Sequence, residues 1–382
     1  MHPYESRFSA IFGNDYHAFS FWKGRVALYA ILQSMDLQEN DEVILPGYTC
    51  VVVPNAIRYA GAKPVYAEIA SGHFNLDPAS VRACITSRTR ALIVQHTYGI
   101  PADVQSLQAI AEEHQLPLIE DCAHVLPGSK YQNRLLGSFG NASFFSSQWS
   151  KPYTTGLGGM VITHDGELAA RLKRIQATFD KPSAIHNAQL QIQYALYRRF
   201  FKPQLYWHSQ KALHALSQLG IFVGSSSSTE LTGEKPSDVR WRMGAFQQRV
   251  GLAQMDNLEM NLSHRQALSR YYSEALHRHG WRFDGHLNCR ETILLRFPLE
   301  VQNKDRVLKE ASSAGIELGS WFETPLHPLS LSDHHLIDYK LGSCPVAEST
   351  ASKVINLPLH ERVTRSDADR IVQFVVSHAS PA

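Results

Sequence analysis

The chain has 382 residues, 44% hydrophobic and 19% charged, so it is long enough to bury a core and to form two domains. Its 37 Lys and Arg nearly balance its 35 Asp and Glu without a long run of like charge, which excludes the electrostatic footprint of a nucleic-acid-binding protein. The five cysteines are far apart and form no C-x-x-C pair, so we expect neither a disulfide framework nor a metal site. We also expect no secretory signal, no transmembrane segment and a cytoplasmic location.

Short apolar runs alternate with amphipathic stretches from about position 40. The runs are rich in Val, Ile and Phe and too short for helices, so they are predicted as buried strands at 42–46, 64–69, 91–96, 116–121, 142–146 and 159–163. Helix-length patterns separate several of them, and Asp103 is the predicted N-cap of one. Strand and helix in alternation predict an α/β domain around a mainly parallel sheet.

The pattern changes near position 246, where one long helix is predicted over 246–279, followed by strand-like and helix-like pieces. We therefore predict a large domain over 1–245 and, over 246–382, a linking helix with a smaller α+β domain.

The segment 183–236 interrupts the large domain. It combines an aromatic helical pattern, which carries the basic residues Arg198, Arg199, Lys202 and Lys211, with a Ser-rich run that predicts a mobile surface loop. The helical part suits a lid over a cleft, a subunit contact or a membrane-surface helix. The first two are favoured, because aromatic residues at helical spacing usually pack against protein.

Two candidate residues follow predicted strands. Asp121 ends the run 116–121, and ligands of parallel sheets bind beyond the carboxyl ends of strands, although an Asp there is also common as a turn or cap residue. Lys151 follows the run 142–146 in a loop with Ser146, Gln148 and a Gly-rich turn. A lysine so placed can form a Schiff base with a carbonyl cofactor if burial lowers its pKa; otherwise it is an ordinary solvated lysine.

A third candidate is the turn at Gly24 and Arg25, which opens a helix predicted to run to about Met35. Backbone N–H groups at a helix start favour an anion, and an arginine adds a charged donor. Alone this motif is weak evidence for an anion site, and it becomes informative only together with Asp121 and Lys151.

These motifs have a specific order along the chain. G-x-x-A-L from Gly24 is followed by PGYTCVVVPNAIRYAGAKPVYAEI, HTYGIPAD, IEDCAH, FFSSQWSKPYTTGLGGMVIT, WRMGAFQQRVGLAQMDNL and PVAESTASKVINLPLH. From about Phe19 to the C-terminus, the sequence resembles the DegT/DnrJ/EryC1/StrS family of pyridoxal-phosphate-dependent sugar aminotransferases. The resemblance implies the fold-type I architecture, with a mainly parallel seven-stranded sheet between helices. It also implies a homodimer with active sites at the interface.

The resemblance assigns roles to individual residues. Lys151 matches the lysine that holds pyridoxal phosphate as a Schiff base and moves the Cα proton, and Asp121 matches the carboxylate paired with the pyridinium nitrogen. His124 occupies the position near the ring hydroxyl. Gly24, Arg25 and Ser146 fall in the phosphate cradle. Arg240 stands where many members have an Asn that reaches the partner subunit's phosphate.

Several positions depart from the family pattern. Cys50 stands where an aromatic residue commonly stacks on the cofactor, so stacking is weakened or supplied by a neighbour such as Tyr48. Arg25 replaces a Thr, Arg240 an Asn, and Leu157 an acidic residue. None of these changes removes a required catalytic group.

The substrate side is less defined. Tyr48, Gln148, Glu323 and His327 are predicted to contact substrate, and His360 is a further candidate for the mouth of the site. His96, Tyr98 and Asp103 match an H-x-Y-G-x-x-x-D stretch of the family or simply fix a strand-to-helix turn. The histidines show no metal-ligand spacing, so no metal is expected.

The resulting functional hypothesis is transfer of an amino group, from glutamate, to a keto-sugar in amino-sugar or cell-surface polysaccharide biosynthesis. The keto-sugar can be nucleotide-linked, a keto-sugar acid or a cyclitol ketone. One alternative is a sugar dehydratase, but related dehydratases have histidine where this chain has Lys151. The other is a regulatory or binding protein without turnover, which the joint presence of Lys151 and Asp121 disfavours.

Overall fold

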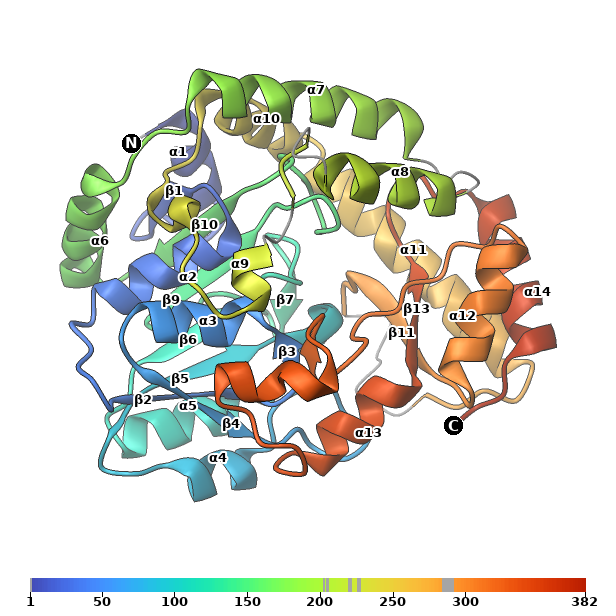
Figure 1. Cartoon of the computed structure of the whole chain (residues 1–382), viewed down its shortest axis with the longest axis horizontal. Helices are drawn as coiled ribbons and strands as arrows, with labels where there is room; N and C mark the ends of the chain where they lie inside the picture. The colour runs from blue at the N-terminus through green and yellow to red at the C-terminus, as the bar shows by residue number, and fades with distance from the viewer. Residues whose placement is uncertain (1, 202, 204–205, 219–221, 225–227, 284–291) are drawn as a thin grey trace.

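A seven-stranded sheet forms the centre of the molecule, in the order β1-β10-β9-β6-β5-β2-β4 (Figure 1). The computed structural model describes residues 2–201, 203, 206–218, 222–224, 228–283 and 292–382. The sheet is mainly parallel: β10 is antiparallel to its neighbours β1 and β9, and the other pairings are parallel. The strands are β1 (His17–Phe21), β2 (Glu42–Pro46), β4 (Lys63–Ala67), β5 (Thr89–Gln95), β6 (Leu118–Asp121), β9 (Ala142–Ser146) and β10 (Gly159–Thr163).

This sheet confirms the predicted α/β class and the alternation of strands and helices. The bounds predicted for β2, β9 and β10 are those observed, and the other predicted strands shift by a few residues. No local pattern predicts strand β1, because its place in the sheet comes from pairing with β10, far along the chain.

Both faces of the sheet are buried. In β5, Ala91 and Ile93 belong to one apolar cluster while Leu92 and Val94 belong to another, as the two-residue period of a strand requires. One cluster includes residues of α2, α3 and α6, and the other includes residues of α4 and α5. These helices are α2 (Gly24–Gln33), α3 (Val52–Tyr59), α4 (Pro78–Cys84), α5 (Val104–Glu113) and α6 (Gly166–Thr178), and α1 (Pro3–Ser9) contacts β1. Asp103 caps α5 as predicted, accepting from the Ser106 backbone N–H at 3.3 Å.

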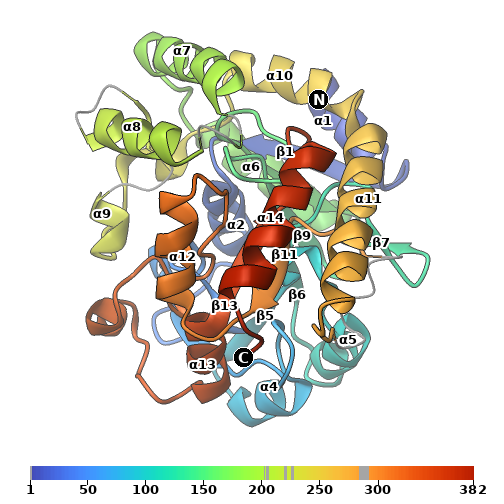
Figure 2. The same ribbon diagram turned by 90° about the vertical axis from the view of Figure 1, so that its right-hand side faces the viewer.

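The C-terminal part has its own small sheet, in which β11 (Arg296–Glu300) pairs antiparallel with β13 (Val354–Pro358). Figure 2 shows α11, α12 and α14 gathered around it. The helices are α10 (Ala245–Met255), α11 (Leu258–His277), α12 (Lys304–Ser313), α13 (Pro345–Lys353) and α14 (Arg365–His378). The single helix predicted over 246–279 is wrong: Asn257, with φ −105° and ψ 5°, is non-helical and separates α10 from α11. The domain boundary at 245/246 stays a prediction.

A two-residue parallel pairing joins the N-terminal and C-terminal parts. Strand β12 (Leu326–His327) lies beside β3 (Thr49–Cys50), with His327 opposite Cys50. A hairpin of β7 (Lys130–Tyr131) and β8 (Arg134–Leu135) and the short helices η1 (Thr97–Gly99), η3 (Ser237–Arg240) and η5 (Leu331–Ile337) complete the elements used below.

The segment 183–236 forms α7 (Ala184–Phe200), α8 (Tyr206–Gln218) and α9 (Ser228–Leu231). Tyr197 of α7 donates to the Trp149 carbonyl at 2.9 Å, beside the Lys151 loop, and Trp207 of α8 donates to the Ile316 carbonyl at 2.8 Å. These contacts with protein favour the lid and packing interpretations. Lys202, residues 219–221 and the serines at 225–227 of the Ser-rich run lie outside the described residues. Among the helices that are described, none is long and apolar enough to span a membrane.

Candidate active site

The site is built at the carboxyl ends of the parallel strands. Asp121 ends β6, Ser146 ends β9, and Lys151 lies in the loop that follows β9. Gly24 begins α2, whose first turn contacts this edge of the sheet. Residues from distant parts of the sequence therefore meet where ligands of open parallel sheets bind.

Lys151 has the altered acidity that a Schiff-base lysine requires. Burial lowers its pKa from 10.5 to about 8, although Cys50 and Asp121 act in the opposite direction. Its Nζ lies 4.8 Å from the centroid of the Trp321 ring, a cation–π contact. The alternative of an ordinary solvated lysine does not fit this desolvated amine.

Asp121 is a buried carboxylate, 3% exposed, at the end of β6. Burial raises its pKa to about 6, and the opposing effects come from the Ala123 backbone N–H, from Lys151 and from His96. The hydrogen bond from Ala123 to its Oδ1 measures 2.9 Å. At neutral pH the carboxylate is mainly ionised, and a buried anion of this kind favours a cationic partner.

His124 is held between aromatic rings. Its ring stacks on Trp321, with centroids 5.6 Å apart and an interplanar angle of 17°, and on Tyr98 at 6.1 Å. Nδ1 accepts from the Tyr98 backbone N–H at 3.0 Å, which leaves the proton of the neutral ring on Nε2. Burial and the charge of Lys151 lower the pKa of His124 well below its usual value, so the neutral form prevails.

Gly24 allows the start of α2 to approach Ser146 closely. A Cβ at Gly24 would lie 2.9 Å from the Ser146 Cβ and 3.1 Å from its Oγ. The N-cap of α2, Lys23, makes no side-chain capping bond, because an ammonium group has no acceptor for the backbone N–H groups; it pairs with Asp238 at 2.6 Å. A helix start and a hydroxyl so close together form a cradle suited to an anion.

Arg25 and Cys50 border the same region. The side chain of Arg25 is 6% exposed and forms an ion pair with Glu230 of α9, a partner that the sequence did not reveal. Burial raises the pKa of the Cys50 thiol, while the charges of Arg25 and Lys151 oppose the rise. Both residues therefore lie within electrostatic reach of the site.

Tyr48 and Gln148, both predicted to contact substrate, differ in how deeply they are buried. Tyr48 is fully buried, with its hydroxyl 2.7 Å from that of Tyr98 and its ring edge-on to Phe322, so it packs inside the core. Gln148 is half-buried, and its carbonyl accepts from the Lys151 backbone N–H at 2.9 Å.

The C-terminal candidates lie on one short stretch. The Glu323 backbone N–H faces His327 Nδ1 at 3.4 Å, while its exposed carboxylate accepts from Ser320 at 2.7 Å. Burial and the cations Lys304, Lys151 and Arg296 lower the pKa of His327 to about 3. His360 instead binds Glu317 at 3.0 Å.

Arg240 is not joined to this group within one chain. It is exposed on the surface, donates to Thr178 at 3.4 Å and lies over the Phe179 ring at 5.7 Å. Within the single chain the guanidinium thus contacts an aromatic face and a hydroxyl, and its reach to the partner subunit's phosphate stays a prediction.

No sequence motif predicts that Trp321 and Arg296 belong to the site. The Arg296 guanidinium lies 4.6 Å from the Trp321 centroid, the ring that Lys151 also contacts. Both come from the C-terminal part, far along the chain from Lys151, and no local motif marks them. Only the folded chain brings these aromatic and cationic groups to the lysine.

A buried cluster of His96, Glu120 and Cys122 has the donor atoms of a metal site. Hydrogen bonds within the protein explain this cluster without a metal ion. The Ala102 N–H donates to His96 Nδ1 at 3.1 Å, so the protonated Nε2 donates to Glu120 at 3.0 Å. Glu120 also accepts the backbone N–H groups of 137, 139 and 140. These bonds fix the loop after β6 and explain the burial of the cluster.

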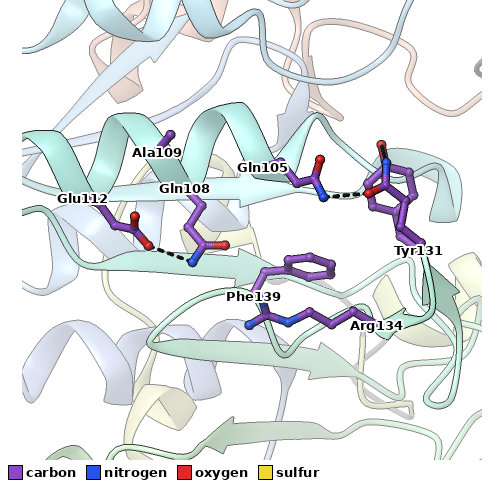
Figure 3. Close-up of a pocket in the computed structure, with 8 residues that line it drawn as sticks. Gln105, Gln108, Ala109, Glu112, Tyr131, Arg134 and Phe139 are labelled. Atoms are coloured by element: carbon purple, nitrogen blue, oxygen red, sulfur yellow. Dashed lines mark hydrogen bonds between the residues drawn. The ribbon is translucent and has the colours of Figure 1, made fainter.

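A shallow hollow elsewhere contains none of the candidate residues (Figure 3). It is lined from α5 by Gln105, Gln108 and Glu112 and, across from them, by Arg134 and Phe139. The guanidinium of Arg134 covers the Phe139 ring at 4.3 Å, and Gln108 donates to Glu112 at 2.9 Å. The side chains that line this hollow thus bind one another through a hydrogen bond and a cation–π contact.

Comparison with known proteins assigns the chain to a family. The profile of the DegT/DnrJ/EryC1/StrS aminotransferase family matches residues 1–194 and 208–376. The chain belongs to this family. It is an aminotransferase by that membership, and the expected resemblance is confirmed.

Similar proteins include sugar aminotransferases. The chain is 29% identical to GDP-perosamine synthase from Caulobacter vibrioides over 364 residues, 93% of this chain and 84% of that protein. It is 33% identical to a pleiotropic regulatory protein from Geobacillus stearothermophilus over 377 residues, 96% and 86% of the two chains. The crystal structure of S. venezuelae DesV in complex with a ketimine intermediate matches with a TM-score of 0.70 and 26% identity, covering 98% of this chain and 87% of that one.

Pyridoxal phosphate is the cofactor of this aminotransferase family. The residues present fit it: Lys151 offers a desolvated amine, Asp121 a buried carboxylate for the ring nitrogen, and Gly24 with Ser146 a cradle for the phosphate. The donor set therefore suits the carbonyl, the pyridine and the phosphate of one molecule.

Proposed function

We propose that the chain transfers an amino group from glutamate to a keto-sugar, in the biosynthesis of amino sugars or cell-surface polysaccharide. It acts as a cytoplasmic homodimer with an active site at each side of the interface. The observation that carries this proposal is the pair Lys151 and Asp121, whose pKa values are shifted to about 8 and about 6. An amine with a pKa near neutrality suits proton transfer at a carbonyl centre, and an ionised buried carboxylate suits a protonated ring nitrogen.

The bound cofactor would supply an electron sink for removal of the substrate's Cα proton. Lys151 would carry that proton, because an amine with a pKa near 8 both accepts and releases a proton at neutral pH. Asp121, ionised and buried, would keep a proton on the ring nitrogen. Gly24 and Ser146 would hold the phosphate, and His124 and Trp321 exclude water from the lysine side of the site.

The shifted pKa values of Lys151 and Asp121 support turnover over a purely regulatory role, because ionisable groups perturbed in this way are typical of active sites. The regulatory name of one relative does not decide the matter, since fold likeness alone does not set function. The dehydratase alternative is disfavoured by the same lysine.

Spectroscopy of the purified protein tests the proposal. Reconstituted protein should show the absorbance band of a Schiff base, and glutamate should bleach it to the spectrum of pyridoxamine phosphate. A panel of nucleotide-linked keto-sugars, keto-sugar acids and cyclitol ketones should then include one compound that restores the band. Failure of every amino acid to bleach a reconstituted protein would contradict the transaminase proposal and favour a binding role.

A further inference from the structure

A buried ion pair lies at the first turn of α2, where the phosphate cradle begins. The Arg25 side chain is 6% exposed and the Glu230 side chain 1% exposed. Glu230 belongs to α9, in the segment 183–236, so a remote piece of chain supplies the counter-charge. Burial of either charge alone would carry a large desolvation cost, which means that each depends on the other.

Glu230 is held in place by more than Arg25. Asn55 of α3 donates to the Glu230 carbonyl at 2.7 Å, and Tyr59 donates to the Glu234 carbonyl at 2.6 Å. Lys235 donates to the Tyr29 hydroxyl of α2 at 2.7 Å. Residues 228–235 are called the α9 strap below. These hydrogen bonds attach the strap to α2 and α3, and Figure 1 shows α9 beside both helices.

The pair lies within electrostatic reach of the proposed site. Both Arg25 and Glu230 act on the Cys50 thiol, with opposite effects on its pKa, and Arg25 also acts on Lys151. Lys23, the adjacent buried cation, is paired separately with Asp238, which also accepts from the Trp22 indole at 3.1 Å. Each buried cation at the start of α2 therefore has its own carboxylate from the chain between 228 and 238.

We propose that Glu230 is an internal competitor for Arg25, so that the α9 strap sets how tightly the cradle holds a phosphate monoester. The inference rests on the proposed phosphate site at Gly24. A guanidinium already neutralised by a fixed carboxylate attracts a phosphate less, and the carboxylate itself repels the dianion. The arginine then orients the phosphate but adds less to its binding affinity than an unpaired arginine would.

Glu230→Gln tests the competition, with Glu234→Gln as the matched control, because that glutamate is exposed in the same strap. Binding of pyridoxamine 5′-phosphate and of pyridoxamine is measured by fluorescence titration. The two ligands differ only in the phosphate, and neither carries the aldehyde that reacts with Lys151. We expect Glu230→Gln to tighten the phosphate ligand about tenfold, to leave pyridoxamine unchanged and to lower the melting temperature without ligand, while Glu234→Gln changes none of these.

A second pair of variants keeps the test valid if Glu230→Gln does not fold. Arg25→Gln leaves the Glu230 charge without its counter-charge and should weaken binding of pyridoxamine 5′-phosphate at least tenfold. Arg25→Gln combined with Glu230→Gln removes the pair as a unit and should bind within about threefold of wild type. Equal weakening in the single and double variants, or weaker binding by Glu230→Gln, would overturn the competition alone. No binding of the phosphate ligand by wild type would overturn the proposed cofactor site as well.

Discussion

Lys151 and Asp121 show how burial alone prepares two ordinary side chains for chemistry. Desolvation is the largest cause of both pKa shifts, downward for the amine and upward for the carboxyl. Each charge partly stabilises the other, so burial brings both pKa values close to neutrality without neutralising either group at pH 7.

Replacing the lysine should abolish turnover. In Lys151→Ala no other amine is placed to bind the cofactor carbonyl or to move the Cα proton, so the steady-state rate should fall by at least about 10³-fold. The cofactor can still bind non-covalently. Steady-state amino transfer by the purified variant, at a rate near that of wild type, would refute the assignment.

Asp121→Asn should separate folding from catalysis. The amide is similar in shape but holds no charge, so it no longer favours a proton on the ring nitrogen, and the half-reaction with glutamate should slow by about 10²-fold or more. The far-UV circular dichroism spectrum should match that of wild type. A wild-type half-reaction rate would show that Asp121 has only a structural role.

Attachment of the cofactor should depend on pH through Lys151. Because burial lowers the pKa of its amine to about 8, the protonated form dominates below pH 8 and the nucleophilic form above it. The rate of Schiff-base formation at fixed pyridoxal phosphate should therefore rise with a midpoint near pH 8, as followed by stopped-flow absorbance. A midpoint near 10.5, the ordinary value for lysine, would mean that the amine is not desolvated.

The residues found from sequence are those embedded in local motifs. Asp121 ends a buried strand and Lys151 lies in the loop after another, so the hydrophobic pattern of the strands locates both residues. Glu230, Trp321 and Arg296 have no such context, because they reach the site only through packing of distant segments. Tyr48 shows the converse: a good motif position whose side chain turns into the core.

At the scale of elements, two helices that begin with glycine allow a matched comparison. Gly24 opens α2 against Ser146, whereas Gly166 opens α6 with no atom within 4 Å of the place that a Cβ would take. Gly24→Ala should displace the helix start and weaken binding of pyridoxamine 5′-phosphate about tenfold, while Gly166→Ala should leave it unchanged. Equilibrium dialysis measures both. Equal affinities in the two variants would show that the start of α2 does not touch the ligand.

The elements differ in how far local sequence predicts them. β2, β9 and β10 are continuous apolar runs between turns, so their bounds could be predicted closely. The interruption between α10 and α11 could not, because Asp256 and Asn257 are tolerated inside helices and lack the clear stop of a proline or glycine. The pairing of β1 with β10 is likewise a long-range event.

At the scale of the whole molecule, the prediction of a shared active site concerns Arg240. The surface position of this residue leaves its guanidinium accessible to a second subunit. We expect Lys151→Ala and Arg240→Ala to be inactive alone and to regain activity when mixed under conditions of subunit exchange, because one site of the heterodimer has both residues. Each variant incubated with itself is the control. Demonstrated exchange without recovery would defeat the shared site.

The short pairing of β3 with β12 has a consequence for the order in which the protein opens. Thr49 donates to the Pro325 carbonyl and Val51 to the His327 carbonyl, both at 2.8 Å, between segments that lie far apart in the sequence. Closing so large a loop costs entropy and the pairing itself adds two backbone hydrogen bonds, so we expect this pairing to form late in folding and to open early. The amide hydrogens of Thr49 and Val51 should thus exchange with deuterium faster than those of Leu92 and Val94 in central β5. Their exchange rates measure how often β3 and β12 separate.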